Sequence, residues 1–388
     1  MTASGIDAQD ASPPTSQSIE RDNETLPVMN IRLVTLVGAG AAMADAMRDS
    51  QEILEKRFIE RGIDVRPIDL GDWSLAAVPA ILRAISSEKP DVLLMQYPTG
   101  GFGASLGPIG VGALQRIAPL VVMLHEFTAA HPLRKLAIGA LLARATLIGL
   151  AGDREAAYLR RLYPWVRNRL RHIPIASNLP RRSWSPTVPP RVTYFGQLRP
   201  EKGLETFFAC QSIVAAAIPE VEFLIIGATV PKYVEYSRAV RAQAQAQNVR
   251  LLHGPEAGAA ADALSQSSVA LLPFPDGASF RRGTLFAAVG CGVPLVTNVG
   301  RDTPSQLLPF LEPAGDVASL CALTLRYLRD ERSRTEASAR SLRLSDLFGW
   351  DKTVTHYLRV FAEVAGSKPA LGIDGQTFAP DGIHQQVS

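Results

Sequence analysis

Cysteine, net charge and long apolar runs are all scarce in this chain of 388 residues. Its three cysteines are odd in number and far apart, which excludes a disulfide framework and a cysteine metal site and favours a reducing compartment. The chain has 40 Lys and Arg against 37 Asp and Glu, and a net charge of +3 is too small to indicate nucleic-acid binding. The most apolar region, residues 133–152, is interrupted by three cationic residues and falls short of the ~20 apolar residues of a membrane span.

The two ends differ from the middle of the chain. Residues 1–28 are polar and acidic with no apolar stretch, so we expect a disordered tail there rather than a secretory signal. Residues 367–388 have a similar composition, and we expect a flexible tail there too. The remainder is typical of a globular protein, with 47% hydrophobic and 20% charged residues in the whole chain. The length predicts two to three domains.

Short apolar runs alternate with helix-like segments between the tails, a pattern typical of parallel α/β sheets. In the first half we expect strands at residues 31–37, 65–70, 92–96, 121–124, 146–150 and 171–175. In the second half we expect them at residues 192–195, 221–226, 249–252, 269–272 and 295–297.

A proline-rich segment, residues 179–190, separates the two halves and predicts a linker. We therefore expect two doubly wound, Rossmann-like domains, residues 29–178 and 191–345, that face each other across a cleft. A closing segment, residues 346–366, would contain a last helix at 351–365, and its apolar stripe requires an apolar partner surface.

The segment from Gly196 to Gly203 joins an expected strand to an expected helix. A glycine turn at a strand end lets backbone N–H groups approach an anion, and the helix N-terminus adds partial positive charge. Arg199 and Lys202 would supply full charges for a diphosphate. The alternative is an ordinary strand–helix turn with two solvated cations.

A second cationic loop precedes an apolar helix in the same half. It contains Ser279, Arg281 and Arg282, and Asp276 lies three residues before that serine. The backbone N–H groups at its end and the two guanidinium groups would form an anion-binding site. The residues that would supply those N–H groups are Gly283 and Thr284. Surface charge without a ligand is the alternative interpretation.

Two motifs in the first half also follow expected strands. Gly38 and Gly40 are the first two glycines of a dinucleotide fingerprint, but Met43 stands where its third glycine or alanine belongs. A loop that lines a cleft explains these glycines equally well. His125 and Glu126 stand at a strand end, where they could orient a substrate hydroxyl or transfer a proton. A histidine that only forms a hydrogen bond within the cleft wall is the alternative.

Residues 154–182 contain eight arginines and one acidic residue, a local charge of +7 that the overall charge hides. Two tyrosines and a tryptophan are interleaved with them. Such a segment would be attracted to an anionic membrane surface. A solvated charged face is the alternative, and no nucleic-acid partner is expected because no recognised nucleic-acid module accompanies the segment.

Taken together, these motifs resemble the GT-B glycosyltransferases of glycosyltransferase family 4. Residues 192–205, VTYFGQLRPEKGLE, resemble the strand, loop and helix that open the family's donor-binding domain. Residues 283–298 resemble its long apolar helix and the Gly-Val-Pro strand that follows. Residues 311–316 resemble the loop that comes next in the family, and residues 349–351 resemble its closing segment. Residues 173–178 resemble the entry to its hinge.

The resemblance implies transfer of a sugar from a nucleotide-diphosphate sugar to an acceptor hydroxyl by a hexosyltransferase, with retention at the anomeric carbon, in bacterial polysaccharide or glycolipid assembly. It implies a saccharide or lipid-linked saccharide acceptor and a cytoplasmic location, peripheral at the inner face of the cell membrane. No metal or other cofactor is expected, because the sequence has no Asp-x-Asp cluster and no His/Cys ligand pattern.

The resemblance also assigns roles to residues. The catalytic residues would be His125, Lys202 and Arg282. The acceptor side would include Gly38, Gly40 and Glu126. The donor would be bound by Gly196, Arg199, Lys202, Asp276, Ser279, Arg281, Arg282, Gly283 and Thr284.

Three positions depart from the family's pattern. The family often places two glutamates eight positions apart around the donor, and those positions hold Ser279 and Ala287 here. Gln197 stands where the family has an arginine, although neighbouring arginines could replace its charge. A second hypothesis is therefore an inactive GT-B protein that binds sugar nucleotides. A third is a dinucleotide-dependent oxidoreductase, against which the loops of Lys202 and Arg282 argue.

Overall fold

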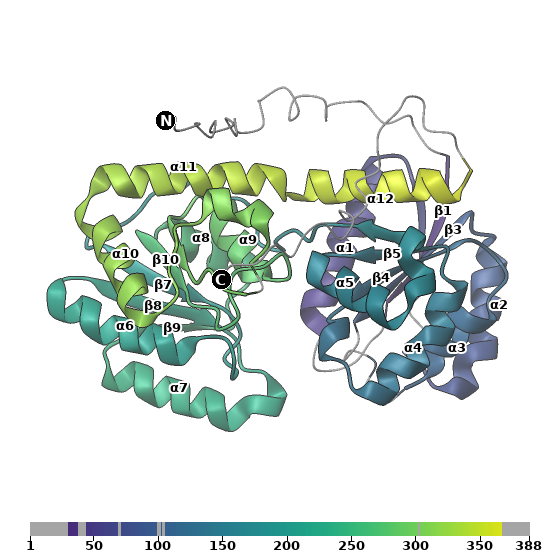
Figure 1. Cartoon of the computed structure of the whole chain (residues 1–388), viewed down its shortest axis with the longest axis horizontal. Helices are drawn as coiled ribbons and strands as arrows, with labels where there is room; N and C mark the ends of the chain where they lie inside the picture. The colour runs from purple at the N-terminus through teal and green to yellow at the C-terminus, as the bar shows by residue number, and fades with distance from the viewer. Residues whose placement is uncertain are drawn as a thin grey trace, which may run out of the picture.

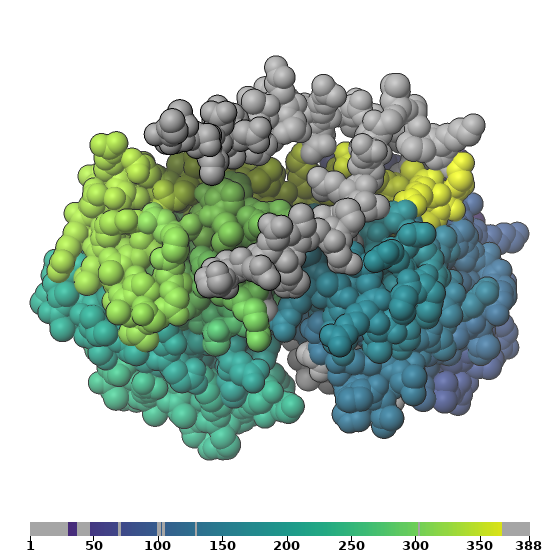
Figure 2. Space-filling model, viewed as in Figure 1, coloured from purple at the N-terminus to yellow at the C-terminus, as the bar shows by residue number. Residues whose placement is uncertain are grey.

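The computed structural model describes residues 30–37, 44–68, 71–98, 102, 105–301 and 303–366. Figure 1 shows two α/β domains, each built on a parallel sheet. The predicted fold class, two Rossmann-like doubly wound domains, is confirmed. Space-filling atoms show the domains as two lobes, with a furrow between them on the lower side of the view (Figure 2).

The first domain has a six-stranded sheet in the order β2-β1-β3-β4-β5-β6, with every pairing parallel. Its strands are β1 Arg32–Val37, β2 Asp64–Ile68, β3 Val92–Pro98, β4 Leu120–His125, β5 Leu147–Leu150 and β6 Leu170–His172. Its helices are α1 Ala44–Glu60, α2 Val78–Glu88, α3 Gly107–Leu114, α4 Pro132–Arg144 and α5 Asp153–Leu162.

The second domain has a five-stranded parallel sheet in the order β11-β10-β7-β8-β9. Its strands are β7 Arg191–Phe195, β8 Glu222–Gly227, β9 Arg250–His253, β10 Val269–Leu272 and β11 Leu295–Thr297. Its helices are α6 Leu204–Ala217, α7 Val234–Ala246, α8 Ala257–Ser265, α9 Gly283–Gly290, α10 Val317–Arg329 and α11 Glu331–Leu347.

Each sheet has a hydrophobic core on both faces, because successive side chains of a strand point to opposite sides. In the first domain Val34 and Leu93 belong to one core, whereas their neighbours Leu33 and Leu94 belong to the other. The second domain has the same alternation along β8. Strands buried on both faces must be almost continuously apolar, which is why the sequence reveals them so clearly.

All eleven expected strands are present, with ends that differ by a few residues. The expected strand at 171–175 ends earlier, at His172, because Pro174 has no backbone N–H for a further ladder bond. The expected strand at 65–70 is observed as Asp64–Ile68, and its last two residues lie outside the described part. The linker segment lies on the second domain, where the Trp184 indole N–H donates to the Ser267 carbonyl at 2.8 Å.

The last helix, α12 Trp350–Val364, returns to the first domain after α11 has packed on the second (Figure 1). Its apolar stripe is buried in the core between α1 and the first sheet. The ring centroids of Tyr357 and Phe361 lie 5.6 and 5.3 Å from that of Phe58 in α1. The expectation that this helix needs an apolar partner is therefore confirmed.

Replacing Phe361 by alanine should reduce the free energy of unfolding of the first domain by about 3–5 kcal/mol, because a fully buried ring is lost from between α12 and α1. Urea denaturation followed by circular dichroism measures this. Ile59→Ala, which removes a side chain that is 59% exposed, is the control and should change stability by about 0.5 kcal/mol or less. Equal losses in the two variants would contradict the packing of α12.

Candidate functional site

The order of the second sheet reverses between β7 and β10, which are neighbours in space but not in sequence. Loops that leave such a pair of strands run to opposite faces, and the crevice between them is the usual ligand site of an open parallel sheet. Here those loops are residues 196–203 and 273–282, the two cationic loops of the sequence analysis. The first sheet reverses between β1 and β3, and the loop after β1, with Gly38 and Gly40, lies outside the described residues.

The two cationic loops touch through their backbones at Gly203. This residue has φ +80°, and a Cβ on it would lie 1.8 Å from the Pro273 carbonyl oxygen. Glycine is therefore required, both for its conformation and for its lack of a side chain. At the other end of the loop, a Cβ on Gly196 would lie 2.8 Å from the Tyr194 hydroxyl oxygen. That hydroxyl donates a hydrogen bond to the Lys202 carbonyl oxygen at 3.1 Å, so a side chain of β7 holds the end of the loop in place.

Lys202 lies partly buried in this crevice among like charges. Burial lowers its pKa most, the guanidinium groups of Arg199 and Arg282 lower it further, and the result is a pKa of about 7. The charge of Glu126 in the first domain opposes this shift. Arg199 is held by a hydrogen bond from its Nε to the Gln197 side chain at 3.2 Å. A diphosphate in the crevice would restore the full charge of the lysine.

Asp276 holds the two arginines of the second loop. One carboxylate oxygen pairs with Arg281 at 2.5 Å, and the other pairs with Arg282. The Arg282 guanidinium also lies 4.6 Å from the centroid of the Phe274 ring, and only 10% of its side chain is exposed. Burial and the charge of Arg199 lower the pKa of Arg282. The carboxylate therefore positions both cations rather than acting as an independent acid or base.

Two buried polar atoms of this loop have no hydrogen-bond partner among the described residues, the Arg282 Nε and the Ser279 hydroxyl oxygen. A buried polar group without a partner is costly, and a ligand is one way to satisfy it. α9 begins directly after Arg282, with Gly283 and Thr284 in its first turn and no side-chain cap. A Cβ on Gly283 would meet nothing within 4 Å, so packing does not require that glycine.

His125 stands at the end of β4, on the first domain's side of the cleft. Its Nε2 lies 2.9 Å from the Gln96 side-chain oxygen, and the Gln96 amide donates to the Tyr357 hydroxyl at 2.9 Å. Burial lowers the pKa of His125 to about 4, so the imidazole is neutral at pH 7. Because the Gln96 oxygen only accepts, the His125 Nε2 carries the proton and Nδ1 is an acceptor. Sequence reasoning missed Gln96 and Tyr357, although a glutamine inside an apolar strand is a visible signal.

Two contacts join the domains beside this cleft. The Gln306 amide donates to Asp153, the first residue of α5, at 3.4 Å. The Phe280 ring packs edge-on against His172, with centroids 5.7 Å apart. Burial lowers the pKa of Arg154, the residue after Asp153, and the charges of Arg281 and Arg301 in the second domain lower it further. This arginine therefore lies near the second domain, although the sequence analysis assigned it only to the basic segment.

The basic segment does not form one surface. Arg171 pairs with Glu363 of α12, and Arg182 pairs with Asp262 of α8 at 2.5 Å. Arg169 donates to carbonyl groups at the C-terminus of α4. These arginines join structural elements, whereas the ones that remain exposed on α5 and the turn after it include Arg161 and Arg167.

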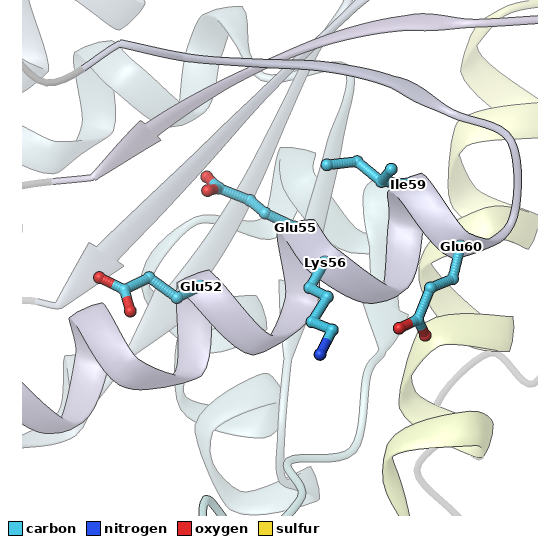
Figure 3. A pocket seen from close by; sticks show the side chains of 5 residues that line it. All are labelled: Glu52, Glu55, Lys56, Ile59 and Glu60. Carbon is cyan, nitrogen blue, oxygen red and sulfur yellow. The ribbon is translucent and has the colours of Figure 1, made fainter.

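Other features add little to the site. Within the described residues, no group of three or more His, Cys, Asp or Glu side chains is placed to hold a metal ion. None of the helices there is long and apolar enough to cross a membrane. A pocket of about 470 Å³ lies along α1, and Figure 3 shows its lining. Its three glutamates would repel a diphosphate. The lining residues are Glu52, Glu55, Lys56, Ile59 and Glu60.

Comparison with known proteins gives a family match in the second domain. Residues 189–330 match the family described as "Glycosyl transferases group 1". This segment spans β7 to α10 and contains both cationic loops. No curated protein matches the sequence.

Several solved structures have the same two-domain arrangement. One is the HepE protein of Anabaena in complex with UDP and glucose, which is 13% identical to this chain. Its TM-score is 0.61, and the match covers 87% of this chain and 100% of that one. A glycosyltransferase from Rickettsia africae is 9% identical, with a TM-score of 0.63 over 87% and 99% of the two chains. The GtfA/B complex is 15% identical, with a TM-score of 0.54 over 75% of this chain and 61% of that one.

The chain thus spans less than two thirds of some of the proteins that it resembles, including the GtfA/B complex and, at 58%, TarM of S. aureus. At these identities the likeness shows the fold. The protein has the two-domain GT-B fold, and its second domain matches the family of group 1 glycosyl transferases.

Proposed function

We propose that the protein transfers a sugar from a nucleotide-diphosphate sugar to an acceptor hydroxyl. The observation that carries this proposal is the crevice between β7 and β10, where Lys202 and Arg282 lie together with the N-termini of α6 and α9. Helix N-termini and cations at one point form a binding site for a diphosphate. The family match over this same segment supports the proposal.

The proposed mechanism uses the cations to stabilise the departing nucleoside diphosphate as negative charge develops on it. The first domain would supply the acceptor side, with neutral His125 near the transferred sugar and Glu126 facing the cations. Closure of the two domains would exclude water, so that transfer competes with hydrolysis. No metal takes part in this proposal, because Lys202 and the arginines supply the positive charge.

The finer features of the proposal rest on the resemblance of residues 192–205 to family 4 enzymes. We infer a hexosyltransferase that retains the anomeric configuration and acts in bacterial polysaccharide or glycolipid assembly, in the cytoplasm. UDP is the first nucleotide to test, since the HepE structure was determined with UDP and glucose. Ser279 offers its unpartnered hydroxyl where the family often has a glutamate. A protein that binds the nucleotide without transferring sugar remains the second hypothesis, because Ser279 and Ala287 provide no carboxylate.

A peripheral position at an anionic membrane is part of the proposal, and an exposed apolar surface on the first domain supports it. The surface, named the α4 patch, consists of Leu133 and Leu136 of α4, which are 72% and 73% exposed, with Leu162 and Trp165, which are 44% and 49% exposed. Tyr163 joins the two parts, because its hydroxyl donates to the Lys135 carbonyl at 2.5 Å and its ring lies 5.4 Å from the Trp165 ring.

Exposed cations accompany the α4 patch, namely Arg144, Arg161 and Arg167. Apolar side chains with an interfacial tryptophan and neighbouring arginines suit an anionic lipid surface. Because α4 follows β4 and His125, a membrane at the α4 patch would lie beside the acceptor side of the cleft. A lipid-linked saccharide is the acceptor that this position favours.

Lys202→Ala and Arg282→Ala should each weaken binding of the nucleoside diphosphate by about tenfold or more, since each removes a charged hydrogen bond worth ~1.5–3 kcal/mol. A thermal-shift screen with UDP, GDP, dTDP, ADP and NAD(H), followed by calorimetry, measures this. Lys232→Ala, an exposed lysine of the same domain, is the control and should bind like the wild type. A response to NAD(H) alone would contradict the proposal and favour the oxidoreductase.

Binding of the diphosphate should take up a proton at pH 8 and almost none at pH 6. The free protein has a Lys202 pKa of about 7, and the negative charge of a bound diphosphate raises that pKa. Affinity should therefore fall by up to about tenfold per pH unit above pH 7. Calorimetry in two buffers of different ionisation enthalpy counts the protons. Lys202→Arg, which stays charged, should bind without uptake, and the same uptake in this variant would show that another group titrates.

The double variant Leu133→Asp/Leu136→Asp should lose co-sedimentation with vesicles that contain phosphatidylglycerol, while its affinity for the nucleoside diphosphate stays the same. Two added carboxylates oppose both apolar insertion and attraction to anionic lipid. Leu342→Asp, on the second domain and 48% exposed, is the matched control. If wild type and double variant sediment equally, the membrane part of the proposal is wrong.

A further inference from the structure

Two segments of the described chain connect the domains, and they lie side by side. The first is residues 173–190, after β6, and the second is the short break between α11 and α12, which Figure 1 shows end to end above both domains. The Trp350 indole N–H donates to the Ser177 carbonyl at 2.7 Å, and the Arg181 guanidinium donates to the Ser345 carbonyl at 2.9 Å. Because these hydrogen bonds tie the two connections together, they form one hinge.

Aromatic rings from four segments meet beside this hinge. His172 ends β6 directly before the first connection, and its ring centroid lies 5.7 Å from that of Phe280 in the loop after β10. The Phe280 ring also lies 4.9 Å from Phe348, which stands in the break between α11 and α12. Phe348 in turn lies 5.5 Å from Phe286 of α9. These are the separations of rings in contact, and Phe280 at the centre is only 3% exposed.

The His172 ring is held in place by the first domain. Its Nε2 donates to the Ala151 carbonyl at 3.2 Å, and its centroid lies 6.1 Å from the ring of His356 in α12. Burial lowers the pKa of His172, so the imidazole is neutral at pH 7 and packs as an aromatic ring. The rings therefore form a continuous link from α9 of the second domain to α12 of the first.

Phe280 belongs to the same loop as the residues that would hold the diphosphate. It lies within a tight turn, in which the Arg282 N–H donates to the Ser279 carbonyl at 3.0 Å. The Ser279 hydroxyl and the Arg282 Nε are the two buried polar atoms of this loop that lack a partner among the described residues. A shift of the Phe280 ring must therefore shift the atoms that a bound diphosphate would contact.

We propose that Phe280 and His172 are positioning residues that couple occupancy of the donor crevice to the orientation of the two domains. This inference rests on the proposed function and deepens it by assigning a regulatory role at that site to the hinge. His172 would act only through Phe280, which lies between it and the donor loop. Coupling of this kind is reciprocal, so the domain orientation that favours the ring contact would strengthen nucleotide binding by the same factor.

The place of the contact beside the hinge makes it effective. A displacement close to a hinge moves the far ends of the domains through a larger distance. Phe280 is joined to the donor loop by its backbone, to the hinge by Phe348 and to the first domain by His172. A diphosphate that fixes Ser279 and Arg282 would also fix this ring, and it would favour the orientation in which the ring meets His172.

A double-mutant cycle tests the coupling, with calorimetry of the nucleoside diphosphate that the screen selects. His172→Leu and Phe280→Leu should each weaken binding by about two- to tenfold, which is the effect of losing one aromatic pair. The double variant should bind about as weakly as the weaker of the two single variants, because the same contact is lost only once. His172→Phe keeps a ring at this position and should bind like the wild type.

Small-angle X-ray scattering measures the orientation of the domains in the same variants. The nucleotide should lower the radius of gyration of the wild type, and it should do so less in His172→Leu. Phe58→Leu is the matched control, because it removes a fully buried ring with edge-on neighbours at 5.3 and 5.6 Å in the core of the first domain. It should lower stability but bind the nucleotide like the wild type.

The inference is wrong if His172→Leu binds like the wild type, or if the effects of the two single variants multiply in the double variant. It is also wrong if His172→Phe or Phe58→Leu weakens binding as much as His172→Leu, or if the nucleotide leaves the radius of gyration of the wild type unchanged. A wild type that binds no nucleoside diphosphate would overturn the proposed function and this inference together. A wild type that binds, with His172→Leu unaffected, would overturn the inference alone.

Discussion

The backbone contact between Gly203 and Pro273 is the constraint on which the rest of the site depends. It holds the loop after β7 against the end of β10, with no room for even a methyl group between them. Because the sheet order reverses at these two strands, the contact lies where the crevice opens. This arrangement brings Lys202 and Arg282 close enough for their charges to interact, although eighty positions separate them in the sequence.

Cations that lie together in a partly buried crevice repel one another in the absence of a ligand. Two features of the structure reduce this repulsion. Lys202 becomes easy to deprotonate, whereas Asp276 offsets the charges of Arg281 and Arg282. Across the cleft, His125 is neutral. The second domain thus offers positive charge for an anion, and this side of the first domain presents a neutral imidazole. This asymmetry suits a reaction in which one substrate leaves as an anion and the other attacks as a hydroxyl.

Much of the fold was predictable because its signals are local. Both cationic loops follow apolar runs directly, and so does His125, so the rule that ligands bind at the carboxyl ends of parallel strands located all three. Pairings between distant positions could not be predicted in this way. Gln96 meets Tyr357 only because α12 returns to the first domain. Arg154 looked like part of a basic surface, because its position relative to Arg281 and Arg301 depends on how the two domains meet.

A crystal structure of the protein with UDP, or with the nucleoside diphosphate that the screen selects, tests the central claim most directly. The account predicts that the diphosphate lies between the loops after β7 and β10, with oxygens within hydrogen-bond distance of the Lys202 ammonium and the Arg282 guanidinium. Its phosphates should also face the first turns of α6 and α9. A nucleotide bound in the first domain, or a diphosphate that contacts neither side chain, would contradict it.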